Sequence, residues 1–158
     1  MSYEKPSGYT GGLVEEELLG GHKKVDWDKK RFWTKEDAIE FAKNNQPEEW
    51  GKVDDPKPRF ANDMHALIAD RLELDDYSNL KIYNATGTPL DLFYGVDLFL
   101  EYQDQIVTID ITLNKSKTEY KADFIFNPEK EDMVVLANFI TERFLSKKAT
   151  KNREKQAA

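Results

Sequence analysis

Two aspartates at matching positions of a predicted β-hairpin are the side chains best placed to do chemistry. Alternating apolar residues predict strands over about 95–102 and 105–113, with a two-residue turn at 103–104. This arrangement places Asp97 on the first strand directly opposite Asp110 on the second. Like charges at opposed positions destabilise a sheet, so something should offset their repulsion.

The apolar residues define the register of this hairpin. One face of the first strand carries Val96, Leu98, Leu100 and Tyr102, and one face of the second carries Val107, Ile109, Ile111 and Leu113. Both sets must meet the same core, because a shift by one residue would turn a whole set toward solvent. The two-residue turn therefore pairs Tyr102 with Gln105 and Leu98 with Ile109.

The other face of the hairpin is polar and acidic, since Thr108, Thr112 and Glu101 accompany the two aspartates. Magnesium prefers oxygen ligands and is typically held by one or two protein carboxylates together with waters and phosphate. The pair of Asp97 and Asp110 therefore predicts a magnesium site, with manganese as a substitute. The residues leave a second interpretation open, a solvated strand face whose aspartates stay apart or pair with lysines.

The stretch around this pair resembles the PD-(D/E)xK nuclease superfamily, which has a restriction-endonuclease-like fold. The similarity covers about 60–148 and depends on Gly95-Val96-Asp97, the hairpin turn, Ile109-Asp110-Ile111-Thr112 and the following Lys115, Lys117 and Lys121. The resemblance implies that Asp97 and Asp110 hold magnesium. It also implies a lysine that positions and activates the attacking water.

The sequence departs from the superfamily pattern at two places, the lysine position and the residues before the first acid, because Asp97 follows Gly-Val and not proline. Thr112 stands two residues after Asp110, where the pattern has lysine, so Lys115 or Lys117 at the end of the strand could take that role. Asp91 follows Pro89-Leu90 and is a rival first acid. A further acid could come from the preceding helix, either Asp63 or Asp70.

The function that the resemblance implies is magnesium-dependent hydrolysis of phosphodiester bonds in DNA. With threonine in the lysine position, a slow or inactive enzyme is the alternative. Such a protein would keep the nuclease fold and bind a protein or nucleic-acid partner in a larger assembly, for example a phage-related one.

The elements that position the hairpin follow from periodicity and capping signals. Helices are predicted from Thr34 as N-cap to 44–45, over 60–74, and from Asn127 and Pro128 to about Lys147; further strands are predicted at 80–83 and 122–126, and a loop at 46–58. We therefore expect an α+β or α/β fold, with a four-stranded mixed sheet flanked by helices in a nuclease-like order. We expect residues 1–33 to form an extended, partly flexible arm, 34–148 to form one domain, and 149–158 to form a basic flexible tail.

Composition excludes several classes of site. The 158 residues include 23 basic and 30 acidic side chains, no cysteine and two histidines, so disulfides, cysteine-ligated metals and thiol nucleophiles are excluded. One histidine, His65, is expected to be a surface or hydrogen-bonded residue. Neither a membrane-spanning run nor a secretory signal is visible, so we expect a cytoplasmic protein with no membrane partner.

Basic residues supply candidate nucleic-acid contacts despite the net charge of −7. These are Lys121, Lys147, Lys148 and Lys151, whereas the acidic remainder fits a protein partner better. A second basic stretch, 23–33, interleaves five cations with three aromatic residues and could combine phosphate contacts with base stacking. We expect instead that Trp27, Phe32 and Trp33 pack onto the core, because large aromatic side chains mostly bury area.

Overall fold

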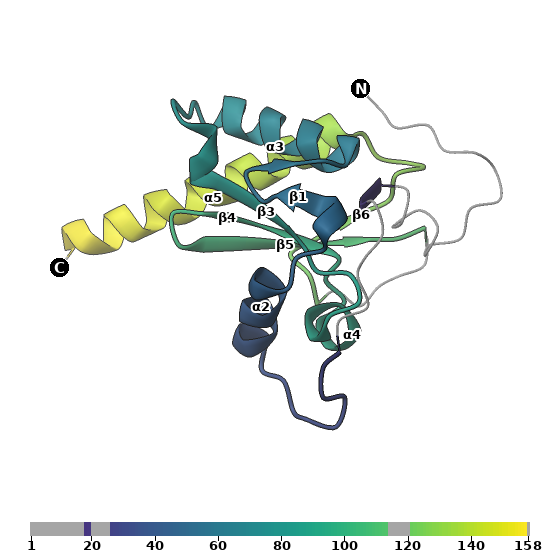
Figure 1. Ribbon diagram of the computed structural model, residues 1–158. Coiled ribbons are helices and arrows are strands. Elements are labelled where there is room, and N and C mark those ends of the chain that lie inside the picture. Colours follow the sequence, from purple (N-terminus) through teal and green to yellow (C-terminus); the bar gives the residue numbers. More distant parts are fainter. Residues whose placement is uncertain (1–17, 20–25, 114–120, 158) are drawn as a thin grey trace.

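The protein is an α+β domain built on one four-stranded mixed sheet, as expected from the sequence (Figure 1). The computed structural model describes residues 18–19, 26–113 and 121–157, with side chains as far as residue 146. The sheet has the order β3 (Leu80–Asn84), β4 (Leu98–Tyr102), β5 (Gln105–Ile111) and β6 (Phe124–Phe126). The first three strands are antiparallel, and β6 is parallel to β5.

Helices cover both faces of this sheet. The helices are α2 (Lys35–Asn44), α3 (Arg59–Arg71), α4 (Pro89–Tyr94) and α5 (Met133–Ala157), with single 3-10 turns at Glu48–Trp50 and Tyr77–Asn79. A small hairpin, β1 (Gly51–Lys52) and β2 (Asp55–Pro56), lies within the stretch that was expected to be a loop.

Apolar side chains divide between the two faces. The face that includes Leu98, Leu100, Ile109 and Ile111 forms a core with α3 and α5. On the opposite face, Tyr83 and Phe99 pack with Ala38 and Ala42 of α2 and Leu90 of α4. The sheet is therefore the middle layer of three, which places the hairpin that carries the acids between two helical layers.

Helix boundaries agree with the sequence in some places and not in others. The N-cap of α2 is confirmed, because the Thr34 hydroxyl accepts a hydrogen bond from the Asp37 amide at 3.1 Å. The predicted start of the last helix is wrong: the Asn127 side chain accepts from the Glu129 amide at 3.0 Å and holds a turn instead. Helix α5 begins at Met133, where Asp132 accepts from the Val134 amide at 2.8 Å.

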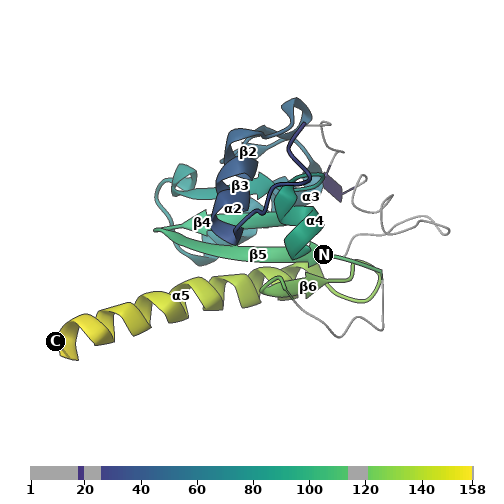
Figure 2. The ribbon, with the colours of Figure 1, turned by 90° about the horizontal axis from the view of Figure 1, so that it is seen from below.

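The far end of α5 also differs from expectation. The helix continues to Ala157, beyond the expected end near Lys147, and its C-terminal part extends past the edge of the sheet (Figures 1 and 2). Helix α4 was not predicted at all. It follows a turn at Gly87-Thr88 and starts with Pro89, a residue whose fixed φ suits the first helical position.

The outer edge of β3 is closed by other parts of the chain. The Gln46 side chain donates to Asn84 O at 2.9 Å and accepts from Asn84 N at 2.8 Å, so it replaces a neighbouring strand there. Trp50 Nε1 donates to Ile82 O at 3.0 Å, and His65 Nε2 lies 2.6 Å from Leu80 O. His65 is therefore a buried, hydrogen-bonded residue, and this edge does not offer a row of unpaired groups to another chain.

Within the described residues, no helix is both long and apolar enough to cross a membrane.

Candidate functional site

The hairpin register predicted from the sequence is confirmed. Tyr102 pairs with Gln105 and Leu98 pairs with Ile109. The turn residues Gln103 and Asp104 have φ values of 49° and 62°, the left-handed geometry of a two-residue turn that matches the twist of the strands.

The ladder is interrupted just before Asp97 and Asp110 would pair. The Asp97 amide donates to Ile109 O at 2.9 Å, although Ile109 is already the partner of Leu98. Two successive residues thus face one residue of β5, which is the arrangement of a β-bulge. The expected direct pairing of Asp97 with Asp110 is therefore wrong.

The bulge also changes which way Val96 faces. Val96 was expected on the same face as Leu98, but it packs with Phe99 and Leu90 on the other side of the sheet. The extra residue in a bulge breaks the strict alternation of side chains along a strand. This is a correction to the sequence-based face assignment.

The bulge brings the Asp97 carboxylate against the backbone of β5. Its Oδ2 accepts a hydrogen bond from the Ile111 amide at 2.7 Å, while the Asp97 amide contacts Ile109 O. Asp97 thereby contacts the peptide groups on both sides of Asp110. Both acids are buried, with 2% of Asp97 and 7% of Asp110 exposed. The structure thus places the two predicted acids next to each other, by a contact that the sequence did not indicate.

Thr108, two residues before Asp110, takes part in a separate group of hydrogen bonds and an ion pair. Asp110 shares its face of β5 with Thr108, whose amide and hydroxyl both donate to Asp123 Oδ2, at 2.9 and 3.1 Å. Arg143 of α5 forms an ion pair with the other oxygen of Asp123 at 3.2 Å. Asp123, which the sequence analysis did not single out, therefore ties β5 to the segment before β6 and to α5.

Two of the other three candidate acids, Asp91 and Asp63, have partners of their own. Asp91 Oδ2 accepts from the Gly87 amide at 2.9 Å and holds the turn before α4. On α3, Asp63 pairs with Arg59 at 3.5 Å and Asp70 is exposed. Helix α3 covers the face opposite to Asp110, so it does not deliver an acid to the site.

The negative charge of Glu101 is balanced by a lysine. It forms an ion pair with Lys43 of α2, and each of these side chains is 21% exposed. Burial is the main reason that the pKa of Tyr83 is raised to about 12, and the negative charge of Glu101 is the second. This group anchors α2 to the sheet and does not belong to the aspartate pair.

The candidate lysines are placed unevenly. Lys115 and Lys117 lie outside the described residues. Lys121 donates from Nζ to Phe93 O at 3.0 Å, near the C-terminus of α4, where a cation is favoured. Lys147, Lys148 and Lys151 lie on the part of α5 that extends past the sheet, where the structure describes the backbone alone.

The two aspartates are the acidic residues that bear on the expected magnesium site. In the described part of the chain, no three acidic, histidine or cysteine side chains gather closely enough to hold a metal. Magnesium needs only one or two protein carboxylates, because it keeps several waters and binds substrate phosphate. Asp97 and Asp110 supply two buried carboxylates, of which Asp97 Oδ2 already accepts a hydrogen bond from the Ile111 amide.

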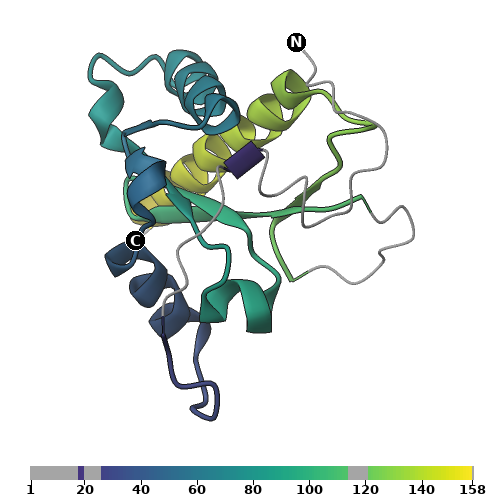
Figure 3. The ribbon, with the colours of Figure 1, turned by 45° about the vertical axis from the view of Figure 1, so that its right-hand side comes forward.

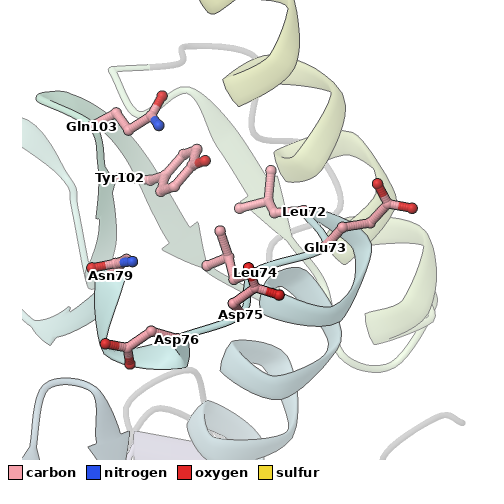
Figure 4. A pocket seen from close by; sticks show the side chains of 8 residues that line it. All are labelled: Leu72, Glu73, Leu74, Asp75, Asp76, Asn79, Tyr102 and Gln103. Atoms are coloured by element: carbon pink, nitrogen blue, oxygen red, sulfur yellow. The ribbon is translucent and has the colours of Figure 1, made fainter.

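A separate cavity lies at the other end of the hairpin. Its volume is about 620 Å³, and the residues that line it are Leu72, Glu73, Leu74, Asp75, Asp76, Asn79, Tyr102 and Gln103 (Figure 4). Tyr102 is five residues from Asp97, which is roughly 16 Å along a strand. The cavity is therefore not a substrate pocket for the aspartate pair.

Comparison with known proteins gives no relative of this chain, since no family model, curated protein or solved structure matches it. The functional argument consequently depends on the residues themselves.

Proposed function

We propose that the protein is a divergent magnesium-dependent nuclease of the PD-(D/E)xK type that hydrolyses phosphodiester bonds in DNA. The observation that supports this most strongly is the position of Asp97, which contacts the backbone on both sides of Asp110. Two buried aspartates thus lie next to each other along the backbone at one end of the hairpin. This is the pair of residues that the superfamily pattern assigns to the metal.

The roles of the chain's own groups follow from this arrangement. Asp97 and Asp110 would hold magnesium, which when bound lowers the pKa of a water and stabilises charge on phosphate. The Ile111 amide orients the Asp97 carboxylate, and burial strengthens the electrostatic interactions of both acids. In place of Thr112, Lys115 or Lys117 is proposed to position the attacking water.

Calorimetric titration with magnesium and with manganese tests the metal site. The wild type should show saturable binding, whereas Asp97→Asn and Asp110→Asn should each lose it. Asp104→Asn is the matched control, because it removes a carboxylate from the far end of the same hairpin and asparagine tolerates the left-handed backbone there. Absence of binding to the wild type, or full binding by both variants, would overturn the proposal.

Cleavage of plasmid and single-stranded DNA tests the reaction itself. Activity should require magnesium and should fall in the two aspartate variants that lose the metal. Lys115→Ala and Lys117→Ala then identify the assisting lysine, which should be the one whose loss costs about a hundredfold in rate.

An inactive scaffold that binds a protein or nucleic-acid partner is the second candidate. Two observations favour it. Thr112 occupies the usual lysine position, and the Asp97 carboxylate already accepts a hydrogen bond from the backbone of β5. In that case Asp110→Asn should leave the protein as stable as the wild type or more so, with no effect of magnesium on either.

A further inference from the structure

The segment of residues 26–33, here called the aromatic loop, is held on the protein by two tryptophans. Trp27 packs edge-on against Trp33 and Phe93, with ring centroids 6.2 and 5.7 Å apart. Trp33 packs in turn against Phe41 of α2 at 5.2 Å. As expected from the sequence, these two rings join the loop to the domain.

Hydrogen bonds fix the path of the loop. Trp27 Nε1 donates to Gly87 O at 3.0 Å, and the Tyr94 hydroxyl donates to Trp33 O at 2.8 Å. Within the loop, the backbone oxygen of Asp28 accepts from Trp33 Nε1 at 3.0 Å, and the Asp28 side chain accepts from the Lys30 amide at 2.9 Å. The turn at the loop's tip is thus ordered before any partner binds.

Phe32 breaks the expectation that all three aromatic residues pack onto the core. It is 83% exposed, the most exposed large apolar side chain among the described residues. Trp27 and Trp33 already occupy the space beside α2 and α4, so Phe32 is directed away. The loop projects beyond both helices, at the bottom of the views in Figures 1 and 3.

Three cations immediately precede this exposed ring. Arg31 forms an ion pair with Asp37 at 3.0 Å and lies over the Trp33 ring at 4.1 Å. Lys29 and Lys30 are exposed, and neither ammonium group has an ion-pair partner in the described part of the chain. The Lys29 ammonium lies 5.9 Å from the centre of the Trp27 ring. The tip of the loop therefore presents two exposed positive charges beside the exposed Phe32 ring.

We propose that the aromatic loop is a binding site for single-stranded nucleic acid, in which Phe32 stacks on a base and Lys29 and Lys30 contact phosphates. Stacking on aromatic rings combined with cations that follow the backbone is how proteins hold single strands without sequence preference. The hydrogen bonds that hold the loop backbone reduce the conformational entropy that is lost on binding.

The chemistry of the tip favours a single strand over other occupants. Bases in a duplex are already stacked on one another, so a ring on a loop gains little from them. A protein partner would need an apolar contact surface larger than one side chain. A flexible strand can offer one base and its flanking phosphates to this small site.

The position of the loop connects it to the aspartate pair, and this part of the inference rests on the proposed function. The loop packs on α4 through Phe93 and Tyr94, and Lys121 binds the Phe93 carbonyl on the same helix. Helix α4 ends three residues before Asp97. A strand that is held at Phe32 would therefore be bound beside the element that leads into the acids.

Fluorescence anisotropy with a labelled single-stranded oligonucleotide of mixed sequence tests the site, in EDTA so that no cleavage occurs. Phe32→Ala should weaken binding about tenfold or more, and Phe32→Trp should restore it. Tyr77→Ala is the matched control, because Tyr77 is an exposed aromatic residue on another part of the surface, and it should bind as the wild type does.

Salt dependence tests the two lysines separately. Each of Lys29→Ala and Lys30→Ala should reduce the slope of log affinity against log salt by about 0.7, the value for one phosphate contact on a single strand. Phe32→Ala should leave that slope unchanged, since stacking releases no counterion.

The outcomes distinguish this proposal from the nuclease. Unchanged binding by Phe32→Ala, or an equal loss for a duplex of the same sequence, overturns the loop proposal even if the metal site is real. Asp104→Asn, at the far end of the β4–β5 hairpin, should keep wild-type affinity in EDTA. Binding that depends on Phe32 in a protein that takes up no magnesium would support the loop and overturn the nuclease.

Discussion

The carboxylate of Asp97 accepts a hydrogen bond from the backbone amide of Ile111 at 2.7 Å. If the β4–β5 ladder continued regularly, a carbonyl of β4 would take this amide. The bulge removes that carbonyl, and a side chain replaces it. The Asp97 carboxylate therefore takes the place of a backbone hydrogen-bond acceptor and is also a candidate metal ligand. The two roles can be separated by mutation.

Asp97→Ala should destabilise the protein by about 1–3 kcal/mol, because it leaves the buried Ile111 amide without its acceptor. Asp97→Asn keeps an oxygen at that position and should lose much less. Urea denaturation in EDTA measures both variants without any contribution from metal. Equal losses in the two variants would show that the hydrogen bond to Ile111 is not what Asp97 contributes.

Thr112→Lys should raise magnesium-dependent cleavage of DNA if the proposed nuclease is correct, because it restores the lysine of the superfamily pattern. One electrostatic stabiliser is worth on the order of a hundredfold in rate, so an increase of about tenfold is a conservative expectation. Plasmid nicking under single-turnover conditions gives the rate. Thr112→Gln is the uncharged control of similar length, and an equal effect of both substitutions would contradict the role of the charge.

Gln46→Ala should destabilise the domain by about 1–3 kcal/mol, since it removes two hydrogen bonds to Asn84 at the outer edge of β3. Gln46→Glu should be nearly as damaging, because a carboxylate cannot donate to Asn84 O. Chemical denaturation measures both, with Gln103→Asn as the control at an exposed turn. Light scattering should also show more self-association of the alanine variant, whose strand edge is uncovered.

Stability should fall between about pH 10 and pH 12 because the pKa of Tyr83 is raised to about 12 by burial and by the charges of Glu101 and Glu40. The unfolded chain releases this proton near pH 10, while the folded protein retains it. The folded state therefore binds more protons in this range. The contribution of Tyr83 to stability is fully present below about pH 10 and is lost as the pH rises to about 12.

The matched variant for this effect is Tyr83→Phe, which keeps the stacking on Phe99 at 4.9 Å and removes the titrating group. The difference in urea midpoint between wild type and variant should change across that range, which separates Tyr83 from lysines that titrate nearby. A difference that stays constant from pH 9 to pH 12 would contradict the assignment.

Local pattern determined the four strands of the main sheet, helices α2 and α3, and the apolar faces of β4 and β5. The alternation of apolar residues along 98–102 and 105–111 was enough to give the hairpin register. A pairing shifted by one residue would expose the whole apolar face of a strand to solvent. The cap at Thr34 and the apolar stripe of α3 were readable for the same reason, since hydrogen bonding and burial there involve residues within a few positions of one another.

Tertiary structure decided where the regular strand pairing ends and which side chains contact one another. Asp97 contacts the backbone on both sides of Asp110 through a bulge, which the alternation of apolar residues did not indicate. The three aromatic residues of 26–33 looked equivalent in sequence, yet only Trp27 and Trp33 found rings to pack against. Spacing fixes which side of an element a residue occupies, whereas its partners depend on segments far away in the chain.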